Sequence, residues 1–309
     1  MSPTSKTGGV AHMLRNIFLL SLPFLAVLLS YFVLDPFRVL YHYQRFDEPL
    51  VAIPNRDYIS TQMYLNTNAQ RHYDSFILGN SRTLAFHIPD WTPYLQNASA
   101  FHYDASGESL YGVWKKLEFL KENGSPIHNA LLVCDAELLA KTDDFDTHIL
   151  RKDPRIIGAL PFAFQLSFVK AYLANNFFYT YFKWQITKQM TPDMAQVLES
   201  RRLYYDPQTN DLVLPDLEAE IKRDSLGFYA RNSRLKIARK PSVNAAVIGA
   251  AQLRQLIAIR NIVQADHTNF QLVISPLFNQ KRLNPADLTI LQHTFGAANV
   301  HDFSGNNPI

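Results

Sequence analysis

The longest uninterrupted apolar segment of the chain covers residues 17–34 and contains no charged side chain. As an α-helix, these 18 residues would rise about 27 Å, close to the hydrocarbon thickness of a bilayer. No small-x-small cleavage motif follows, so the pattern predicts an uncleaved transmembrane anchor over residues 14–35, preceded by a short tail at residues 1–13. The alternative for the same pattern is a helix buried in a protein core.

The charges on either side of this segment predict its orientation. Lys6 and Arg15 precede it, and acidic residues beginning with Asp35 follow it. Because basic residues next to a membrane helix tend to stay in the cytoplasm, we expect a cytoplasmic tail and an extracytoplasmic remainder. Cys134 is the only cysteine, so no intrachain disulfide can form, which fits the cytoplasm and a bacterial periplasm equally well.

Farther along the chain, apolar segments of strand length alternate with helical patterns. This alternation predicts an α/β fold in which helices cover both faces of a parallel sheet. The strand segments are residues 76–78, 98–103, 130–134 and 270–274, with a weaker fifth at 299–303.

Two helices are well marked by their apolar spacing. In the first, an apolar face is predicted to pack on the sheet while Lys115, Lys116 and Lys121 lie off that face. The second covers residues 243–265, where apolar side chains recur at helical spacing. The apolar face of the first helix is formed by Leu110, Val113, Trp114, Leu117 and Leu120.

The remaining segments define the domain organisation. Residues 36–73 are aromatic and polar without a clear period and predict a tether, with a short helix around 58–66. Residues 74–309 form the folded domain. Within it, the strand and helix alternation breaks over residues 140–241, which we interpret as a mainly helical insertion.

The insertion carries an aromatic segment and a basic segment. Residues 162–184 are dense in aromatic side chains, which either pack in a core of the insertion or rest on a membrane interface. The basic segment is either a solvated loop or an attractive surface for an anionic leaflet or glycan. It consists of Arg231, Arg234, Lys236, Arg239 and Lys240.

Composition, charge and the lack of certain motifs argue for a folded protein and against nucleic-acid binding. With 47% hydrophobic and 18% charged residues, the 309-residue chain can bury a large core. A net charge of +3, without a P-loop or zinc-type Cys and His spacing, argues against nucleic-acid binding.

Ser81 is the candidate nucleophile. It follows the first strand within Gly79-Asn80-Ser81-Arg82, and a turn at this position projects its residues beyond the carboxyl edge of a parallel sheet. Gly79 permits a tight turn, and Asn80 is a residue type that accepts positive φ. The alternative for Ser81 is a helix-capping serine. Arg82 either contacts a substrate carboxylate or phosphate, or forms a structural ion pair.

Two further loops are expected to meet at this edge. Gly107 lies near the amino end of the helix after the second strand, where free N–H groups can hold an anion. It is a candidate oxyanion donor together with the N–H of Ser81. A simple turn requirement is the alternative for Gly107. The third strand brings Asp135 to the same edge, where Asn80, Arg82 and Asp135 are candidate substrate contacts.

Gly-Asn-Ser-Arg after the first strand, Ala-Ser-Gly after the second and Asp-Phe-Ser-Gly at the last resemble motifs of the SGNH/GDSL hydrolase superfamily, in particular its bacterial membrane-anchored acyl-transfer branch. The resemblance implies a flavodoxin-like three-layer α/β/α sandwich and ester chemistry through an acyl-enzyme on Ser81. It implies no metal or organic cofactor. It further implies a place in the bacterial inner (cytoplasmic) membrane and a membrane-bound O-acyltransferase as partner.

The chain departs from the family pattern at three places. Asn80 replaces the usual aspartate, and Asp135 stands where the family supplies an oxyanion-hole asparagine. No Asp-x-x-His follows Asp-Phe-Ser-Gly, so either the chain is truncated or the site is inactive. Among other histidines, His301 is a weak candidate base because its side chain is expected to point into a helix layer, and His87 and His102 read as surface or core residues.

The sequence therefore predicts a membrane-anchored serine esterase or O-acyltransferase acting on a cell-envelope glycan or other acyl esters, with the bilayer and the glycan as partners. The rival hypothesis is a non-catalytic, membrane-tethered glycan-binding or assembly protein. A serine without a base within hydrogen-bond reach is a poor nucleophile, which is the reason to keep both.

Overall fold

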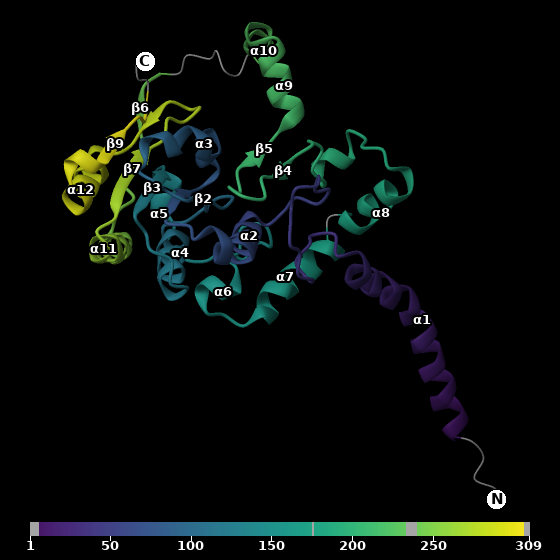
Figure 1. Ribbon diagram of the computed structural model, residues 1–309. Helices are drawn as coiled ribbons and strands as arrows, with labels where there is room; N and C mark the ends of the chain where they lie inside the picture. Colours follow the sequence, from purple (N-terminus) through teal and green to yellow (C-terminus); the bar gives the residue numbers. More distant parts are fainter. Residues whose placement is uncertain (1–5, 175, 233–239, 306–309) are drawn as a thin grey trace, which may run out of the picture.

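The computed structural model describes residues 6–174, 176–232 and 240–305. The first helix, α1 (Lys6–Leu34), projects as an arm from a folded body that contains a parallel sheet (Figure 1). A smaller group of helices lies between the arm and the sheet. Of the basic segment noted above, Arg234, Lys236 and Arg239 fall outside the described residues.

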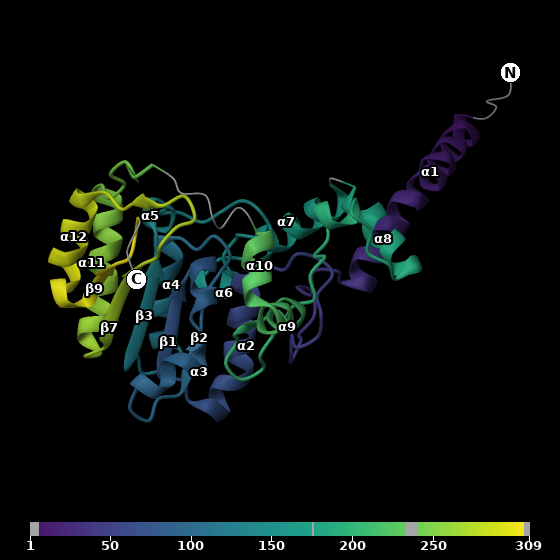
Figure 2. The ribbon, with the colours of Figure 1, turned by 90° about the horizontal axis from the view of Figure 1, so that it is seen from above.

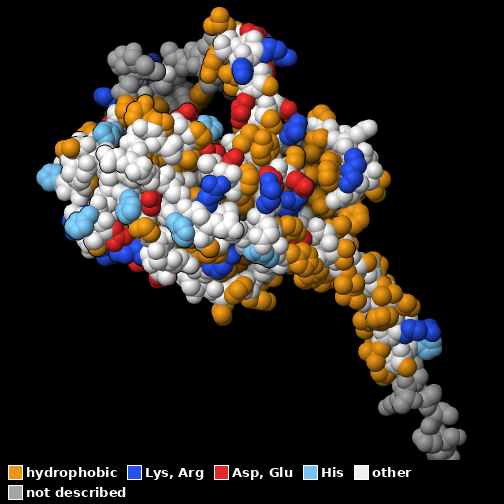
Figure 3. Space-filling view, viewed as in Figure 1, with side chains coloured by type: hydrophobic (Ala, Val, Ile, Leu, Met, Phe, Trp, Pro, Cys, Tyr) orange, Lys and Arg blue, Asp and Glu red, His pale blue; other side chains and the backbone are white. Residues whose placement is uncertain are grey.

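Helix α1 is long and apolar enough to cross a membrane. Its span Gly9–Leu34 has a mean hydropathy of 2.5, and only 6% of its apolar 18-residue segment is buried. Figure 3 shows apolar side chains along the length of the arm. The alternative of a buried core helix is therefore wrong.

Five strands form the central sheet: β1 (Ser75–Gly79), β2 (Ala100–His102), β3 (Asn129–Cys134), β7 (Asn269–Ile274) and β9 (Val300–Asp302). Their order is β2-β1-β3-β7-β9, and all neighbours are parallel. The predicted strands and the parallel sheet are confirmed. Figure 2 shows β2, β1, β3 and β7 side by side.

One face of this sheet carries most of the core. It is covered by α2 (Arg56–Arg71), α4 (Leu110–Glu122), α11 (Ala250–Ala265) and α12 (Pro285–Phe295). On the other face, Ile77, Val133 and Val273 pack with the short helix α3 (Ile88–Trp91) and its neighbours. The expected helices on both faces are thus present, but very unequally.

Two predicted boundaries differ from the structure. The helix expected at 243–265 begins only at Ala250, because the N–H groups of Val247 and Ile248 donate to the Asp287 carboxylate at 2.9 and 3.0 Å and hold that stretch extended. Part of the expected tether, α2, packs its Ile59 and Met63 into the main core. The folded body therefore begins well before residue 74.

The inserted region is mainly helical. Phe164, Phe168 and Tyr172 pack in a second core that also contains Tyr31 of α1 and Phe37. The expectation of an aromatic core is confirmed for these side chains, whereas other aromatic residues of the segment are exposed. The short helix α5 (Ala136–Ala140) precedes this region. The elements of the region are α6 (Pro154–Ile157), α7 (Pro161–Leu173), α8 (Phe177–Thr187), β4 (Tyr204–Tyr205), β5 (Leu212–Val213), α9 (Pro215–Arg223) and α10 (Ser225–Arg231).

Candidate functional site

Ser81 is exposed at the first position of a 3-10 turn, Ser81–Ala85, that follows β1. The turn depends on Gly79, whose φ is +140° and where a Cβ would lie 2.1 Å from the carbonyl oxygen of Val133. The expected positive φ at Asn80 is wrong, because Asn80 is extended with φ −89°. The backbone reverses one residue earlier, where only glycine fits between β1 and β3.

The side chains of Asn80 and Asp135 stabilise this turn through hydrogen bonds. The side-chain nitrogen of Asn80 donates to Oδ2 of Asp135 at 3.1 Å, and its oxygen accepts from the N–H of Arg82 at 3.0 Å. The other oxygen of Asp135 accepts from the N–H of Leu138 and caps α5. Asn80 is 6% and Asp135 2% exposed, so both side chains already serve the architecture of the loop.

Arg82 forms a structural ion pair, one of the two roles expected for it. Its Nε lies 3.4 Å from Oδ2 of Asp135, while the side chain stays 43% exposed. A guanidinium with this exposure can also reach a ligand above the turn. Arg82 is therefore the charged group of this loop that remains accessible beside Ser81.

The loop between β2 and α4 runs along the same edge. The N–H of Tyr103 donates to the carbonyl of Ile77 at 2.8 Å, and that of Ala105 donates to the carbonyl of Gly79 at 3.1 Å. Gly107 follows, exposed and with φ +55°. A Cβ at Gly107 would lie 3.1 Å from the Leu150 side chain, so this loop also borders the inserted region.

A group of buried charges, here called the buried ion cluster, connects this loop to other parts of the chain through Glu108. It consists of Asp57, Glu108, Lys116 and Lys152, all without solvent exposure beyond 2%. The ammonium of Lys116 lies 2.9 Å from Asp57 and 2.8 Å from Glu108, and Lys152 pairs with the same two carboxylates. The expectation that Lys116 lies off the packed face of its helix is wrong.

Electrostatics within the cluster favour the ionised forms of Asp57 and Lys152. Burial alone would raise the pKa of Asp57, but the ammonium groups of Lys116 and Lys152 and the N–H of Asp153 lower it to about 2. Burial lowers the pKa of Lys152, and the carboxylates of Asp57 and Glu108 outweigh that effect and raise it. Neighbouring opposite charges therefore keep Asp57 and Lys152 ionised although both are buried.

Sequence reasoning missed this cluster, although one signal was present. Lys116 falls three residues after Val113 and four before Leu120, so it belongs to the same helical stripe as those buried side chains. A lysine in an apolar stripe indicates a buried partner. The partners of Lys116 come from α2 and the β2–α4 loop, and the insertion supplies the second cation, Lys152. No local pattern connects these segments.

No histidine of the described ranges forms a hydrogen bond with Ser81. His102 is buried, and its Nδ1 lies 2.9 Å from Asp211. His301 is exposed, with its Nε2 2.7 Å from the Gln271 oxygen, so its expected direction into a helix layer is wrong. Within residues 6–174, 176–232 and 240–305, the Ser81 hydroxyl has no hydrogen-bond partner.

No group of three or more His, Cys, Asp or Glu side chains suited to a metal ion occurs in the part of the chain that the structure describes. Burial, with the carboxylates of Asp135 and Asp302, raises the pKa of Cys134 well above its usual value. This thiol is therefore buried and protonated. Ser81, Arg82 and Gly107 are among the exposed residues at this edge.

Comparisons of the chain with protein-family models, with curated proteins and with solved structures gave no match.

Proposed function

We propose that this chain is a membrane-anchored, SGNH-like serine esterase or O-acyltransferase in which Ser81 accepts the acyl group. The observation that carries the proposal is the exposed Ser81 hydroxyl at the carboxyl end of β1. The strand order β2-β1-β3-β7-β9 reverses direction between β1 and β3, as in flavodoxin-like sheets, and open α/β sheets bind ligands at such a reversal. Ser81 follows the strand next to that point.

The chemistry assigned to the site is acyl transfer in two steps. The Ser81 oxygen attacks the carbonyl carbon of the ester, and the C–O bond to the alcohol breaks to give an acyl-serine. The proton of Ser81 passes to the departing alcohol oxygen through a base that the described residues do not supply. A water molecule or a glycan hydroxyl then attacks the acyl-serine and releases Ser81. The N–H groups of Ser81 and Gly107 are the proposed oxyanion donors, and Arg82 is the proposed contact for an anionic part of the substrate.

The proposed setting is the bacterial inner membrane, with α1 embedded and the domain outside the cytoplasm. The apolar span Gly9–Leu34 supports the anchor. The bilayer, a cell-envelope glycan or other acyl ester, and a membrane-bound O-acyltransferase are the proposed partners. The acyltransferase would supply the acyl group across the membrane.

Labelling with a fluorophosphonate probe tests the proposal on the full chain in native membranes. Labelling that is lost in Ser81→Ala and retained in Ser225→Ala is the expected result, since Ser225 is an exposed serine of α10 far along the chain. Absence of labelling in a folded protein would contradict it. Folding is checked in parallel by denaturant unfolding.

A second candidate function is a non-catalytic, membrane-tethered glycan-binding or assembly protein. It is favoured by the Ser81 hydroxyl, which has no base among the described residues, and by Asp135, whose carboxylate would repel an oxyanion. Glycan binding that is equal in the wild type and Ser81→Ala, without fluorophosphonate labelling of either, would favour this function.

A further inference from the structure

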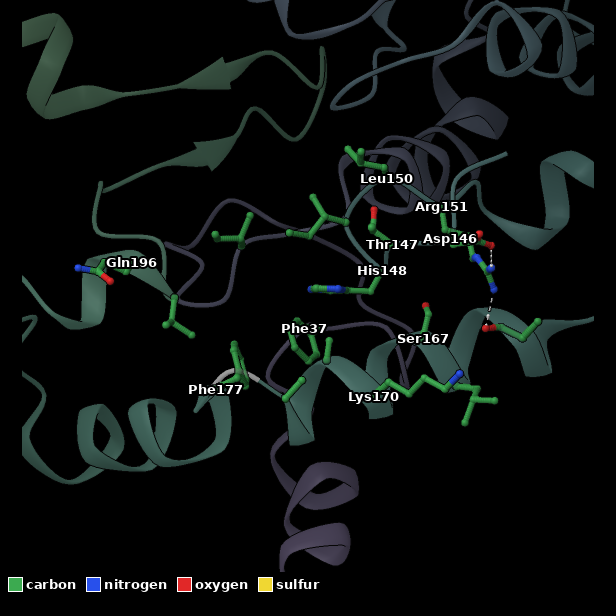
Figure 4. A pocket seen from close by; sticks show the side chains of 17 residues that line it. Phe37, Asp146, Thr147, His148, Leu150, Arg151, Ser167, Lys170, Phe177 and Gln196 are labelled. Atoms are coloured by element: carbon green, nitrogen blue, oxygen red, sulfur yellow. Dashed lines mark hydrogen bonds and ion pairs between the residues drawn. The ribbon is translucent and has the colours of Figure 1, made fainter. Parts of the chain in front are cut away.

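A large cavity lies away from Ser81, between the inserted region and the carboxyl end of α1. Its volume is about 890 Å³. That is within the range of pockets that hold small molecules. Helix α7 forms one wall and residues 146–151 form another (Figure 4). Most of the lining is hydrocarbon, including Phe37, Leu150, Leu166, Ala171, Ala174 and Phe177.

The charged side chains on the cavity wall are not equivalent. Arg151 pairs with Asp146 at 2.9 Å and donates to the carbonyl of Ala163 at 2.8 Å. Lys170 is exposed, and its ammonium has no ion-pair or hydrogen-bond partner in the described ranges. The cavity therefore offers one uncompensated positive charge.

The histidine on the wall adds no charge at neutral pH. The ring of His148 lies 5.3 Å from that of Phe37 and 5.5 Å from that of Phe168. Burial lowers the pKa of His148, so its ring is neutral and contributes to the apolar lining.

The cavity lies next to the membrane helix. Phe37 on its wall is three residues beyond the end of α1. The hydroxyl of Ser30 in α1 lies 2.8 Å from the hydroxyl of Tyr172 in α7, and the Tyr31 and Tyr172 rings are 5.2 Å apart. Figure 1 shows α7 and α8 beside the carboxyl end of α1.

Apolar side chains near the cavity are exposed as well. They include Leu160 at 82%, Phe162 at 74% and Ile186 at 80% exposure. Exposed apolar side chains of this kind, on a body that also carries a helix able to span a membrane, are suited to contact with lipid. A cavity wall that contacts the membrane-type helix is accessible to amphiphiles held in a bilayer.

We propose that this cavity binds the hydrocarbon chain of an anionic amphiphile, with its negatively charged head group at Lys170. The chain would lie against Leu166, Ala171 and Phe177 and exclude water from them. The carboxylate of a free fatty acid and the phosphate of a membrane phospholipid share this chemistry. The site does not involve Ser81, so the inference goes beyond the proposed esterase and does not depend on it.

The test uses the full chain in a fluorinated detergent, which does not mix with hydrocarbon chains. Binding of cis-parinaric acid, a fluorescent fatty acid, is titrated. Ala174→Trp, on the cavity wall, is expected to weaken binding about tenfold, whereas the matched change Ala219→Trp on exposed α9 leaves it unchanged.

The head-group assignment is tested separately. Lys170→Ala is expected to weaken binding of parinaric acid about fivefold and to leave binding of its uncharged methyl ester unchanged. Lys222→Ala, an exposed lysine of α9, is the control. Ser81→Ala is expected to bind like the wild type, which separates this inference from the proposed function.

A second arm in phosphatidylglycerol nanodiscs distinguishes the two sources. Binding in detergent that disappears in nanodiscs assigns the cavity to a membrane phospholipid, and binding in both assigns it to a free acyl chain. The proposal is overturned if parinaric acid does not bind in detergent, or if it binds equally to the wild type, Ala174→Trp and Lys170→Ala.

Discussion

The ammonium nitrogen of Lys116 lies 2.8 Å from Oε2 of Glu108, and neither side chain is exposed to solvent. Glu108 directly follows Gly107, so this ion pair ties the β2–α4 loop to the helix beneath it. Lys152, from the insertion, pairs with the same carboxylate. The shape of the loop beside Ser81 therefore depends on charges supplied by three separate segments.

Removing one cation from this cluster should strongly destabilise the fold. Lys116→Met leaves Asp57 and Glu108 buried with Lys152 as their only cation within the cluster, and we expect a loss of about 3–5 kcal/mol in the free energy of unfolding. Denaturant unfolding of the full chain in detergent measures this loss. Lys115→Met, next to it and paired only with the partly exposed Glu118, should cost less than about 1 kcal/mol. Equal effects of the two changes would show that the cluster contributes little.

The same cluster predicts a dependence of stability on acid. The pKa of Asp57 is about 2 in the folded protein and ordinarily 3.8, so its contribution is complete above pH 3.8 and is lost as the pH falls towards 2. The difference in unfolding free energy between the wild type and Asp57→Asn should therefore shrink by about 2 kcal/mol over this range. Some carboxyls have the opposite pH dependence, such as Asp153, whose pKa is raised by burial. Their contributions are the same in both proteins and cancel in the difference between wild type and variant. A difference that stays constant with pH would contradict the assignment.

Gly79 should be irreplaceable. In Gly79→Ala the new Cβ would lie 2.1 Å from the Val133 carbonyl oxygen and 2.9 Å from the Thr83 side chain, at φ +140°. We expect a loss of roughly 3 kcal/mol or more, because backbone of the sheet itself must move. Gly124→Ala is the matched control, since φ is also positive there but nothing lies within 4 Å of the Cβ. It should cost only about 1–2 kcal/mol. Thermal unfolding of both variants ranks them, and a Gly79→Ala variant as stable as Gly124→Ala would refute the close approach.

Asp135 and Arg82 should differ in importance although they form an ion pair. Asp135→Ala removes the partner of the buried Asn80 side chain and the cap of α5, so we expect a loss of about 2–4 kcal/mol. Arg82→Ala removes only a half-exposed cation and should cost less than about 1 kcal/mol. If Arg82 contacts substrate, Arg82→Ala lowers activity or ligand binding while the unfolding curve barely changes. A reversed order of stabilities would contradict the supporting role of Asp135.

The proposed orientation can be tested with one introduced thiol. Cys134 is buried and its raised pKa keeps it protonated, so it should not react in the folded protein. Ala219→Cys places a thiol on exposed α9. A membrane-impermeant maleimide should label this variant in spheroplasts without permeabilisation and leave the wild type unlabelled. Labelling that requires permeabilisation would place the domain in the cytoplasm.

The strands can be predicted from the local sequence because a buried parallel strand is a short, continuous apolar segment. Residues 76–78, 130–134 and 270–274 were predicted to within a residue or two of β1, β3 and β7. The N-terminal helix was predictable for a similar reason, since 18 uncharged apolar residues have few other structures available. The start of α11 was not, because Asp287, more than thirty residues later, decides where the helix begins.

The sequence by itself determined the α/β class, the apolar arm and the position of Ser81 after the first strand, since each follows from the order of neighbouring residues. Tertiary structure decided that Gly79 rather than Asn80 makes the turn, that Lys116 is buried with Asp57 and Glu108, and that a cavity opens beside α7. The physical reason is that a close backbone approach, the neutralisation of a buried charge and the walls of a cavity each require atoms from distant parts of the chain. The pattern along one segment contains no record of those partners.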